Sequence, residues 1–232
     1  MLALAGLLLL ALASSLPLQA QGGQGNPRVL PPRSLPQGKT YAEWSVAWWQ
    51  WFMGLPLISP AGVTHPGIDD PGFDVAEGQS GSVWFLAAPF PGTHERTCTI
   101  PAGKALFFGT MVSEWSSLEG YATYEEQSYL AWLFAEHIVD LSVTIDGVPV
   151  KNLAAYRLQS PQFEFTAPTP WIFGPEGGAG TAVAEGYYFF LAPLAAGQHT
   201  IHCQGAFYFS TADGDPFDLS APLDMTYHLT VR

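Results

Sequence analysis

The sequence predicts a mostly β protein, an antiparallel β-sandwich of Ig-like or jelly-roll type with two accessory helices. Many short β-rich runs alternate with turns rich in glycine and proline. Only two helix-start signatures interrupt them. Hydrophobic residues make up 48% of the chain against 12% charged, so we expect a packed core rather than a disordered chain.

The first element is a leader over residues 1–20. Leu2 to Leu12 is an uninterrupted apolar run, and Leu18 to Ala20 forms a plausible cleavage site before Gln21. Eleven apolar residues are fewer than the roughly twenty that cross a bilayer. We therefore expect a signal peptide rather than a membrane anchor, secretion to the extracellular space or periplasm, and no membrane span after cleavage.

Residues 21–38 are rich in glycine, proline and glutamine. This composition is typical of a flexible N-terminus, or of an extended arm laid across the domain. Residues 39–232 are then expected to form a single β-sandwich domain, because a chain of this length can bury one substantial core.

The first helix is predicted over residues 41–52, where Thr40 and Glu43 form a capping box. Its tryptophans include Trp48 and Trp49, and so wide an aromatic face must be covered by something. We expect it to pack on the sandwich. The alternative is an exposed aromatic platform on which Trp48 and Trp49 bind a sugar or a partner.

The second helix is predicted from Tyr124 to Val139, after a capping box of Thr123 and Glu126. Asp146-Gly147 indicates a tight hairpin between two strands. The strands are expected at 82–87, 96–100, 105–112, 141–145, 148–151, 162–166, 187–192, 198–209 and 225–231.

Two cysteines, Cys98 and Cys203, occur in the chain. In an oxidising compartment such a pair is more often bridged than free, so we expect a disulfide. The alternative is two buried thiols.

The net charge of −12 argues against nucleic-acid binding and against docking on an anionic membrane. Asp213, Asp215 and Asp218 alternate around Gly214 in a way that suits a calcium loop. The terminal bidentate glutamate of a full calcium loop is missing, and Asp-Gly-Asp-Pro is also ordinary turn chemistry. A plain turn is thus the favoured interpretation; no cofactor is firmly indicated, and calcium stays a candidate.

No nucleophile elbow, zinc-protease motif or phosphate-binding loop is present. The long loop 54–81 is a candidate wall of an active-site cleft, together with His94, Glu95 and Arg96. His94, Glu95 and His199 could converge on a metal in a cupin-like barrel. A glycosidase would need two opposed carboxylates, which the sequence alone cannot pair from its candidates Glu114, Glu125, Glu126, Glu164 and Asp140.

Four stretches, YAEWSVAWWQWF, GQSGSVWFLA, RTCTIPAGKALFF and GQHTI, follow one another along the mature chain. In these four stretches the chain resembles a set of secreted bacterial proteins of unassigned function. The resemblance implies bacterial secretion and one domain, and it implies no catalytic residues.

Two functions follow as expectations. The first is a secreted, acidic β-sandwich module that binds a glycan or a component of the cell envelope. The second is a secreted hydrolase or metal-dependent enzyme, with its cleft beside loop 54–81. An enzyme needs titratable groups that converge in a pocket, whereas a glycan binder needs exposed aromatic rings.

Overall fold

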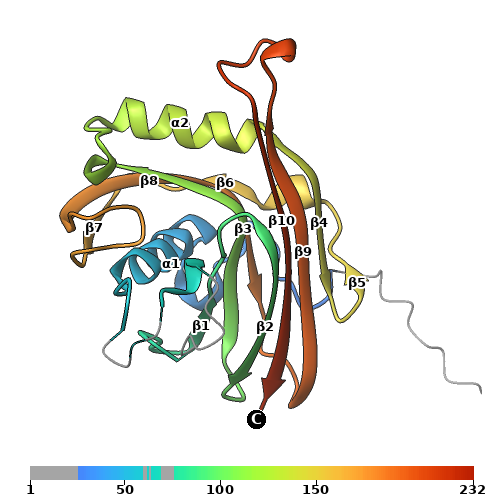
Figure 1. Cartoon of the computed structure of the whole chain (residues 1–232). Helices are drawn as coiled ribbons and strands as arrows, with labels where there is room; N and C mark the ends of the chain where they lie inside the picture. The colour runs from blue at the N-terminus through green and yellow to red at the C-terminus, as the bar shows by residue number, and fades with distance from the viewer. Residues whose placement is uncertain (1–25, 60–61, 63, 69–75) are drawn as a thin grey trace, which may run out of the picture.

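The computed structural model describes residues 26–59, 62, 64–68 and 76–232; the predicted leader lies outside them. Its two five-stranded sheets form a β-sandwich with two helices, which confirms the predicted fold class (Figure 1). The first sheet contains β1 (Val83–Leu86), β3 (Ala105–Ser116), β8 (Gly178–Leu191), β6 (Arg157–Gln159) and β7 (Phe163–Ala167). The second contains β2 (Gly92–Ile100), β10 (Leu219–Val231), β9 (Gly197–Phe209), β4 (Ile138–Ile145) and β5 (Val148–Pro149).

Each sheet contains one parallel pair, which a purely antiparallel sandwich would not have. β1 runs parallel to β3, and β2 runs parallel to β10. The chain crosses from the first sheet to the second between β1 and β2, and it returns between β2 and β3. Because β2 acts as the crossover between β1 and β3, these two strands can lie side by side in the same direction.

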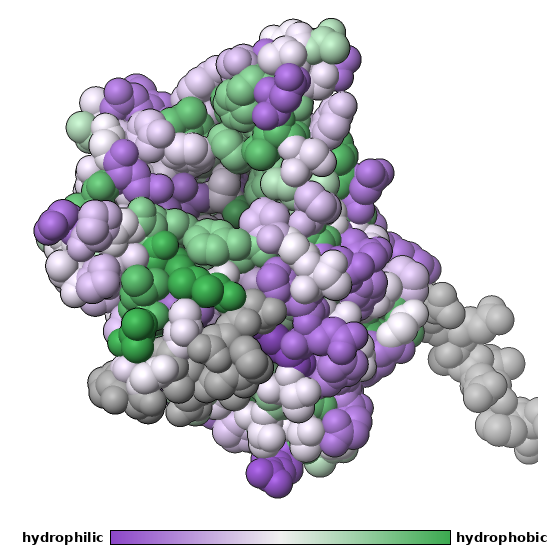
Figure 2. Space-filling model, viewed as in Figure 1, coloured by the Kyte–Doolittle hydropathy of each residue, from purple (hydrophilic) through white to green (hydrophobic). Residues whose placement is uncertain are grey.

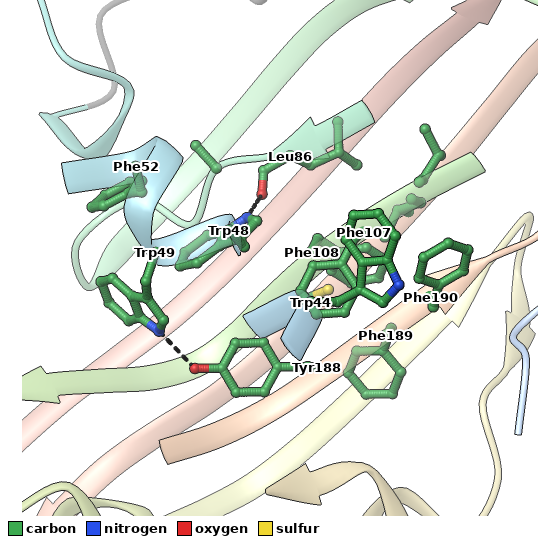
Figure 3. Close-up of a cluster of buried hydrophobic side chains, with 14 of the residues drawn as sticks. Trp44, Trp48, Trp49, Phe52, Leu86, Phe107, Phe108, Tyr188, Phe189 and Phe190 are labelled. Atoms are coloured by element: carbon green, nitrogen blue, oxygen red, sulfur yellow. Dashed lines mark hydrogen bonds between the residues drawn. The ribbon is translucent and has the colours of Figure 1, made fainter. Parts of the chain in front are cut away.

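Helix α1 (Tyr41–Gly54) begins with the predicted capping box of Thr40 and Glu43. Its aromatic face packs on the first sheet, as expected, and Trp48 is 0% exposed. The indole N–H of Trp48 donates to the carbonyl of Leu86 at 2.8 Å, while Trp44 packs against Phe107 and Phe190 (Figure 3). Burying several large aromatic rings makes α1 a principal part of the core rather than an accessory.

Helix α2 (Tyr124–Glu136) also begins with its predicted capping box, and it lies across β8 and β3 at one end of the sandwich (Figure 1). It ends three residues earlier than predicted, because His137 caps it and β4 starts at Ile138. Ala131 and Ala135 are its fully buried apolar residues. Small residues at these positions let the helix approach the sheet closely.

The described part of the N-terminal arm lies along the end of β8. Val29 forms a bridge with Leu191, and the amide of Leu30 donates to the carbonyl of Phe190 at 2.8 Å. Val29 and Leu30 of the arm are therefore paired to the first sheet.

The Asp146-Gly147 hairpin is present between β4 and β5. Ile145 pairs with Val148, and both turn residues have positive φ, 52° for Asp146 and 74° for Gly147. Two positive φ angles are the signature of the turn that the dipeptide predicts.

The predicted disulfide is wrong: Cys98 and Cys203 are both buried and free. Cys98 pairs with Leu229 of β10, whereas Cys203 pairs with Met225 of the same strand. The two cysteines thus lie two strands apart and four residues out of register, which places their Cα atoms about 16 Å apart. A disulfide requires less than about 7 Å.

No helix in the described part of the chain is long and apolar enough to cross a membrane.

Candidate functional site

A cavity of about 340 Å³ lies beside β3, where α1, α2 and the second sheet approach one another. One wall comes from α1, the segment 88–91 and Phe173. The opposite wall comes from Phe134 of α2 and from β9 and β10. Eight of its described lining residues are aromatic: Trp48, Trp49, Phe52, Phe90, Trp115, Phe134, Phe173 and Phe207.

The cavity follows the part of β3 that β1 does not cover. β1 pairs only with Ala105–Phe108, so from Gly109 onward β3 has a strand partner, β8, on one side only among the described residues. This unpaired stretch of the strand includes Met111 to Trp115, all of which line the cavity. The cavity therefore exists because β1 is short.

A β-bulge sets which side chains of β3 reach the cavity. The register with β8 shifts between Thr110 and Val112, and Met111 has a φ of 47°. Gly186 lies opposite, where a Cβ would collide with the carbonyl oxygen of Met111. The extra residue reverses the alternation of faces, so that Val112 and Glu114 share the α1 side of the sheet with Gly109.

Glu114 is the central polar residue of the site. It is 7% exposed, it lines the cavity, and neither of its carboxyl oxygens has a hydrogen-bond partner among the described residues. An unpartnered buried polar group costs roughly 1–3 kcal/mol, so native structures seldom keep one without a reason.

A second carboxyl group, Glu119, lines the same cavity and accepts a hydrogen bond from the Ser116 hydroxyl at 2.7 Å. Burial, and then the nearby Glu119 carboxyl, raise the pKa of Glu114 well above its ordinary value. Burial also raises the pKa of Glu119, although the hydrogen bond from Ser116 opposes this shift. Two carboxyl groups in one buried site cannot both ionise easily.

Two further polar atoms at the cavity have no partner within the described part of the chain. They are the hydroxyl of Ser113 and the indole N–H of Trp115. Trp115 contacts Phe134 of α2, with ring centroids 5.0 Å apart. The cavity is therefore an apolar, aromatic chamber with a few unused hydrogen-bonding groups, which is the usual composition of a small-molecule site.

Trp48 and Trp49, predicted as binding residues, both line this cavity but are buried within the core. The indole N–H of Trp49 donates to the phenol oxygen of Tyr188 at 2.7 Å (Figure 3). In this position they present ring surface to the cavity interior and form no exposed platform. Figure 2 shows an apolar area on this side of the molecule, over α1 and the loops near it.

The three residues proposed around loop 54–81 do not gather at the cavity. His94 and Arg96 share one face of β2, whereas Glu95 is exposed on the other face. Arg96 donates to the carbonyl of Pro66, so it does lie against loop 54–81. None of the described residues of that loop lines the cavity.

Two of the three aspartates of the predicted calcium loop, Asp215 and Asp218, stabilise a turn through their side chains. Asp218 accepts hydrogen bonds from the amide and hydroxyl of Thr211, and Asp215 accepts from the amide of Ser210 and from His137, both within 2.8 Å. Asp213 ends the short 3-10 turn Thr211–Asp213. No group of three His, Cys, Asp or Glu side chains in the described residues could hold a metal ion.

The cupin-like set is also separated. His199 interacts with Asp146 at 2.8 Å, whereas His94 is hydrogen-bonded to the carbonyl of Phe90 at 2.9 Å. Among the candidate carboxylates and histidines from the sequence, Glu114 alone lines the cavity. Sequence reasoning included it only as one of several carboxylates, and Glu119 was missed because nothing in SSLEG predicts burial.

Comparison with known proteins adds little to this geometry. No protein-family model matches the chain, and no curated protein matches it. Among solved structures, the chain is similar to the solution structure of amebosin, at 10% identity over 66% of this chain and 100% of that chain, with a TM-score of 0.21. A similarity this low carries no argument about fold or function.

Proposed function

We propose that this protein is a secreted binding module that holds a compact, largely apolar ligand in the cavity beside β3. The observation that carries the proposal is a set of buried polar atoms without a hydrogen-bond partner among the described residues that line an aromatic chamber. Glu114, Ser113 and Trp115 all line it and leave hydrogen-bonding atoms unused. A bound molecule with one polar end would satisfy them while its apolar body covers the rings.

The expected location follows from the leader sequence and from the resemblance to secreted bacterial proteins, and it stays part of the proposal. An envelope component with an apolar body suits the cavity better than a free glycan does. Each sugar hydroxyl needs a polar partner, whereas most of the lining side chains here are apolar.

The test is to fill the cavity. Ala221 lines it, so Ala221→Phe should reduce binding of the neutral fluorescent probe N-phenyl-1-naphthylamine by about tenfold or more. Ala155→Phe is the matched control, because Ala155 is exposed on a 3-10 turn away from the cavity. Equal probe binding by both variants would overturn the proposal.

A second candidate function, glycan binding, is favoured by one specific observation on α2. Tyr129 and Trp132 are 57% and 44% exposed, with ring centroids 5.9 Å apart and planes at 36°. Exposed aromatic rings of this kind can stack on sugar rings. On a glycan array, Trp132→Ala should remove any binding that Ala221→Phe leaves intact, and binding that survives Trp132→Ala would exclude this surface.

A further inference from the structure

We infer that the cavity beside β3 selects an organic cation, a molecule with an ammonium group at one end and an apolar body. The inference rests on the proposed function and names the class of ligand for the same site. It depends on the acidic and aromatic side chains that line the cavity, and on the absence of basic side chains from its described lining residues.

The ionisable groups of this cavity are acidic. Glu114 and Glu119 line it, and no Lys, Arg or His side chain occurs among its described lining residues. Tyr188 interacts electrostatically with Glu114 and with Glu185, which lies on the same strand as Tyr188. Glu185 is already paired with Arg157 at 2.6 Å, so that guanidinium is engaged outside the cavity.

The two carboxyl groups create an unmet need for positive charge. Burial and mutual repulsion disfavour their ionisation. By geometry, neither carboxyl oxygen of Glu114 has a hydrogen-bond partner among the described residues. An ammonium group placed between the two carboxyl groups would donate hydrogen bonds to them and would also compensate their negative charge. A neutral ligand could satisfy Glu114 but would leave the repulsion in place.

The aromatic lining strengthens the preference for a cation. Ring faces attract ammonium groups, and this attraction grows when water is excluded. The indole rings of Trp48, Trp49 and Trp115 all border the cavity. The same rings offer nothing specific to an anion, which the two carboxyl groups would repel.

An organic cation fits better than a metal ion. The described residues contain no cluster of three metal-ligating side chains, and the aromatic walls cannot replace a hydration shell. An apolar body would instead displace water from those walls. The net charge of −12 would also attract cations from a distance.

Binding of a cation should release a proton. Burial favours the neutral form of Glu114 in the free protein, and a bound ammonium lowers the pKa of a neighbouring carboxyl. The proton leaves Glu114 for the buffer, and the resulting carboxylate accepts hydrogen bonds from the ligand. Neutral ligands should bind without this exchange.

The experiment compares three probes of nearly equal shape by isothermal titration calorimetry: 2-phenylethylamine, 2-phenylethanol and phenylacetate. We expect the amine to bind about tenfold or more tightly than the alcohol, and phenylacetate to bind most weakly. Titrations of the amine in two buffers of different ionisation enthalpy should show proton release. Equal affinities for amine and alcohol would overturn the inference while leaving the proposed function intact.

Glu114→Gln tests the residue directly. It should weaken binding of 2-phenylethylamine by about tenfold and change binding of 2-phenylethanol by less than about threefold. Glu125→Gln is the matched control, because Glu125 is exposed on α2 and loses the same charge. An equal loss in both variants would mean general electrostatics and would overturn the inference. The proton release of the unmodified protein needs no variant, so its absence would overturn the inference even if Glu114→Gln failed to fold. Failure of all three probes would instead contradict the proposed function.

Discussion

Trp49 donates its indole N–H to the phenol oxygen of Tyr188 at 2.7 Å, joining helix α1 to β8. Tyr188 stacks on Phe107 of β3, with ring centroids 5.9 Å apart. Because Trp49 also lines the cavity, the packing of the core and the shape of the site depend on the same helix. This connection makes the stability predictions below relevant to binding.

Replacing Trp48 should be costly. Trp48→Ala should lower the free energy of unfolding by about 3–5 kcal/mol, because a fully buried indole and its hydrogen bond to Leu86 are lost. Trp132→Ala, at an exposed position, should cost less than about 1 kcal/mol. Urea unfolding monitored by circular dichroism measures both values. Similar costs for the two variants would contradict the assignment of Trp48 to the core.

Glu114→Gln should change how stability depends on pH. The folded pKa of Glu114 lies above its unfolded value, so the unfolded chain loses this proton first as pH rises. The unmodified protein therefore loses stability from about pH 4.5 upward, until the folded pKa is reached.

The Glu114→Gln variant has no ionisable group at this position, so its stability does not fall with rising pH for this reason. The free energy of unfolding of the variant, relative to that of the unmodified protein, should increase as pH rises above about 4.5 in a urea unfolding series. A difference that decreases over this range would mean that the folded protein stabilises the carboxylate, and it would refute a neutral Glu114.

His65 should destabilise the protein in acid. Its side chain is buried, Nε2 lies 2.8 Å from the carbonyl of Phe52, and Nδ1 accepts from the amide of Gly67, so the ring is neutral. Burial, helped by the nearby charge of Arg96, lowers the pKa of His65 to about 4. The contribution of neutral His65 to the free energy of unfolding is fully present above the unfolded pKa of about 6.5. It is lost as pH falls to about 4, and the loss amounts to about 3 kcal/mol.

The measurement is urea unfolding across that pH range for the unmodified protein and for His65→Gln. The variant should show a shallower decline, whatever its absolute stability. Equal slopes in the two proteins would contradict a neutral buried His65.

Both cysteines should be present as thiols. Burial raises the pKa of Cys98 and of Cys203 to about 12, so alkylation by iodoacetamide should be very slow in the folded protein. In denaturant without reductant, mass spectrometry should show two added groups per chain. A mass two daltons below the dithiol, with no alkylation, would restore the disulfide that the register of β2, β10 and β9 excludes.

Local signals in the sequence predicted the local structure well. The capping boxes at Thr40 and Thr123 and the hairpin at Asp146-Gly147 depend on residues a few positions apart, and all are present. The start of β8 was missed, because its run of glycine and alanine has low strand propensity. Ala182 and Ala184 are nevertheless fully buried.

Features that depend on distant residues could not be predicted. The bulge at Met111 requires Gly186 opposite it, some seventy positions later, and it decides which face Glu114 occupies. The distance between Cys98 and Cys203 depends on β10 lying between β2 and β9. The sequence could therefore supply Glu114 as one candidate among several, but not the cavity that surrounds it.

The most direct test of the cavity as a ligand site uses its methionine. Met111 lines the cavity, whereas Met53 and Met225 are buried elsewhere in the core. In protein labelled with ¹³C at the methionine methyl groups, titration with 2-phenylethylamine should shift the Met111 resonance to saturation and leave those of Met53 and Met225 in place. If Met111 stays unchanged while the ligand binds, or if all three resonances shift alike, the ligand does not occupy this cavity and the account is wrong.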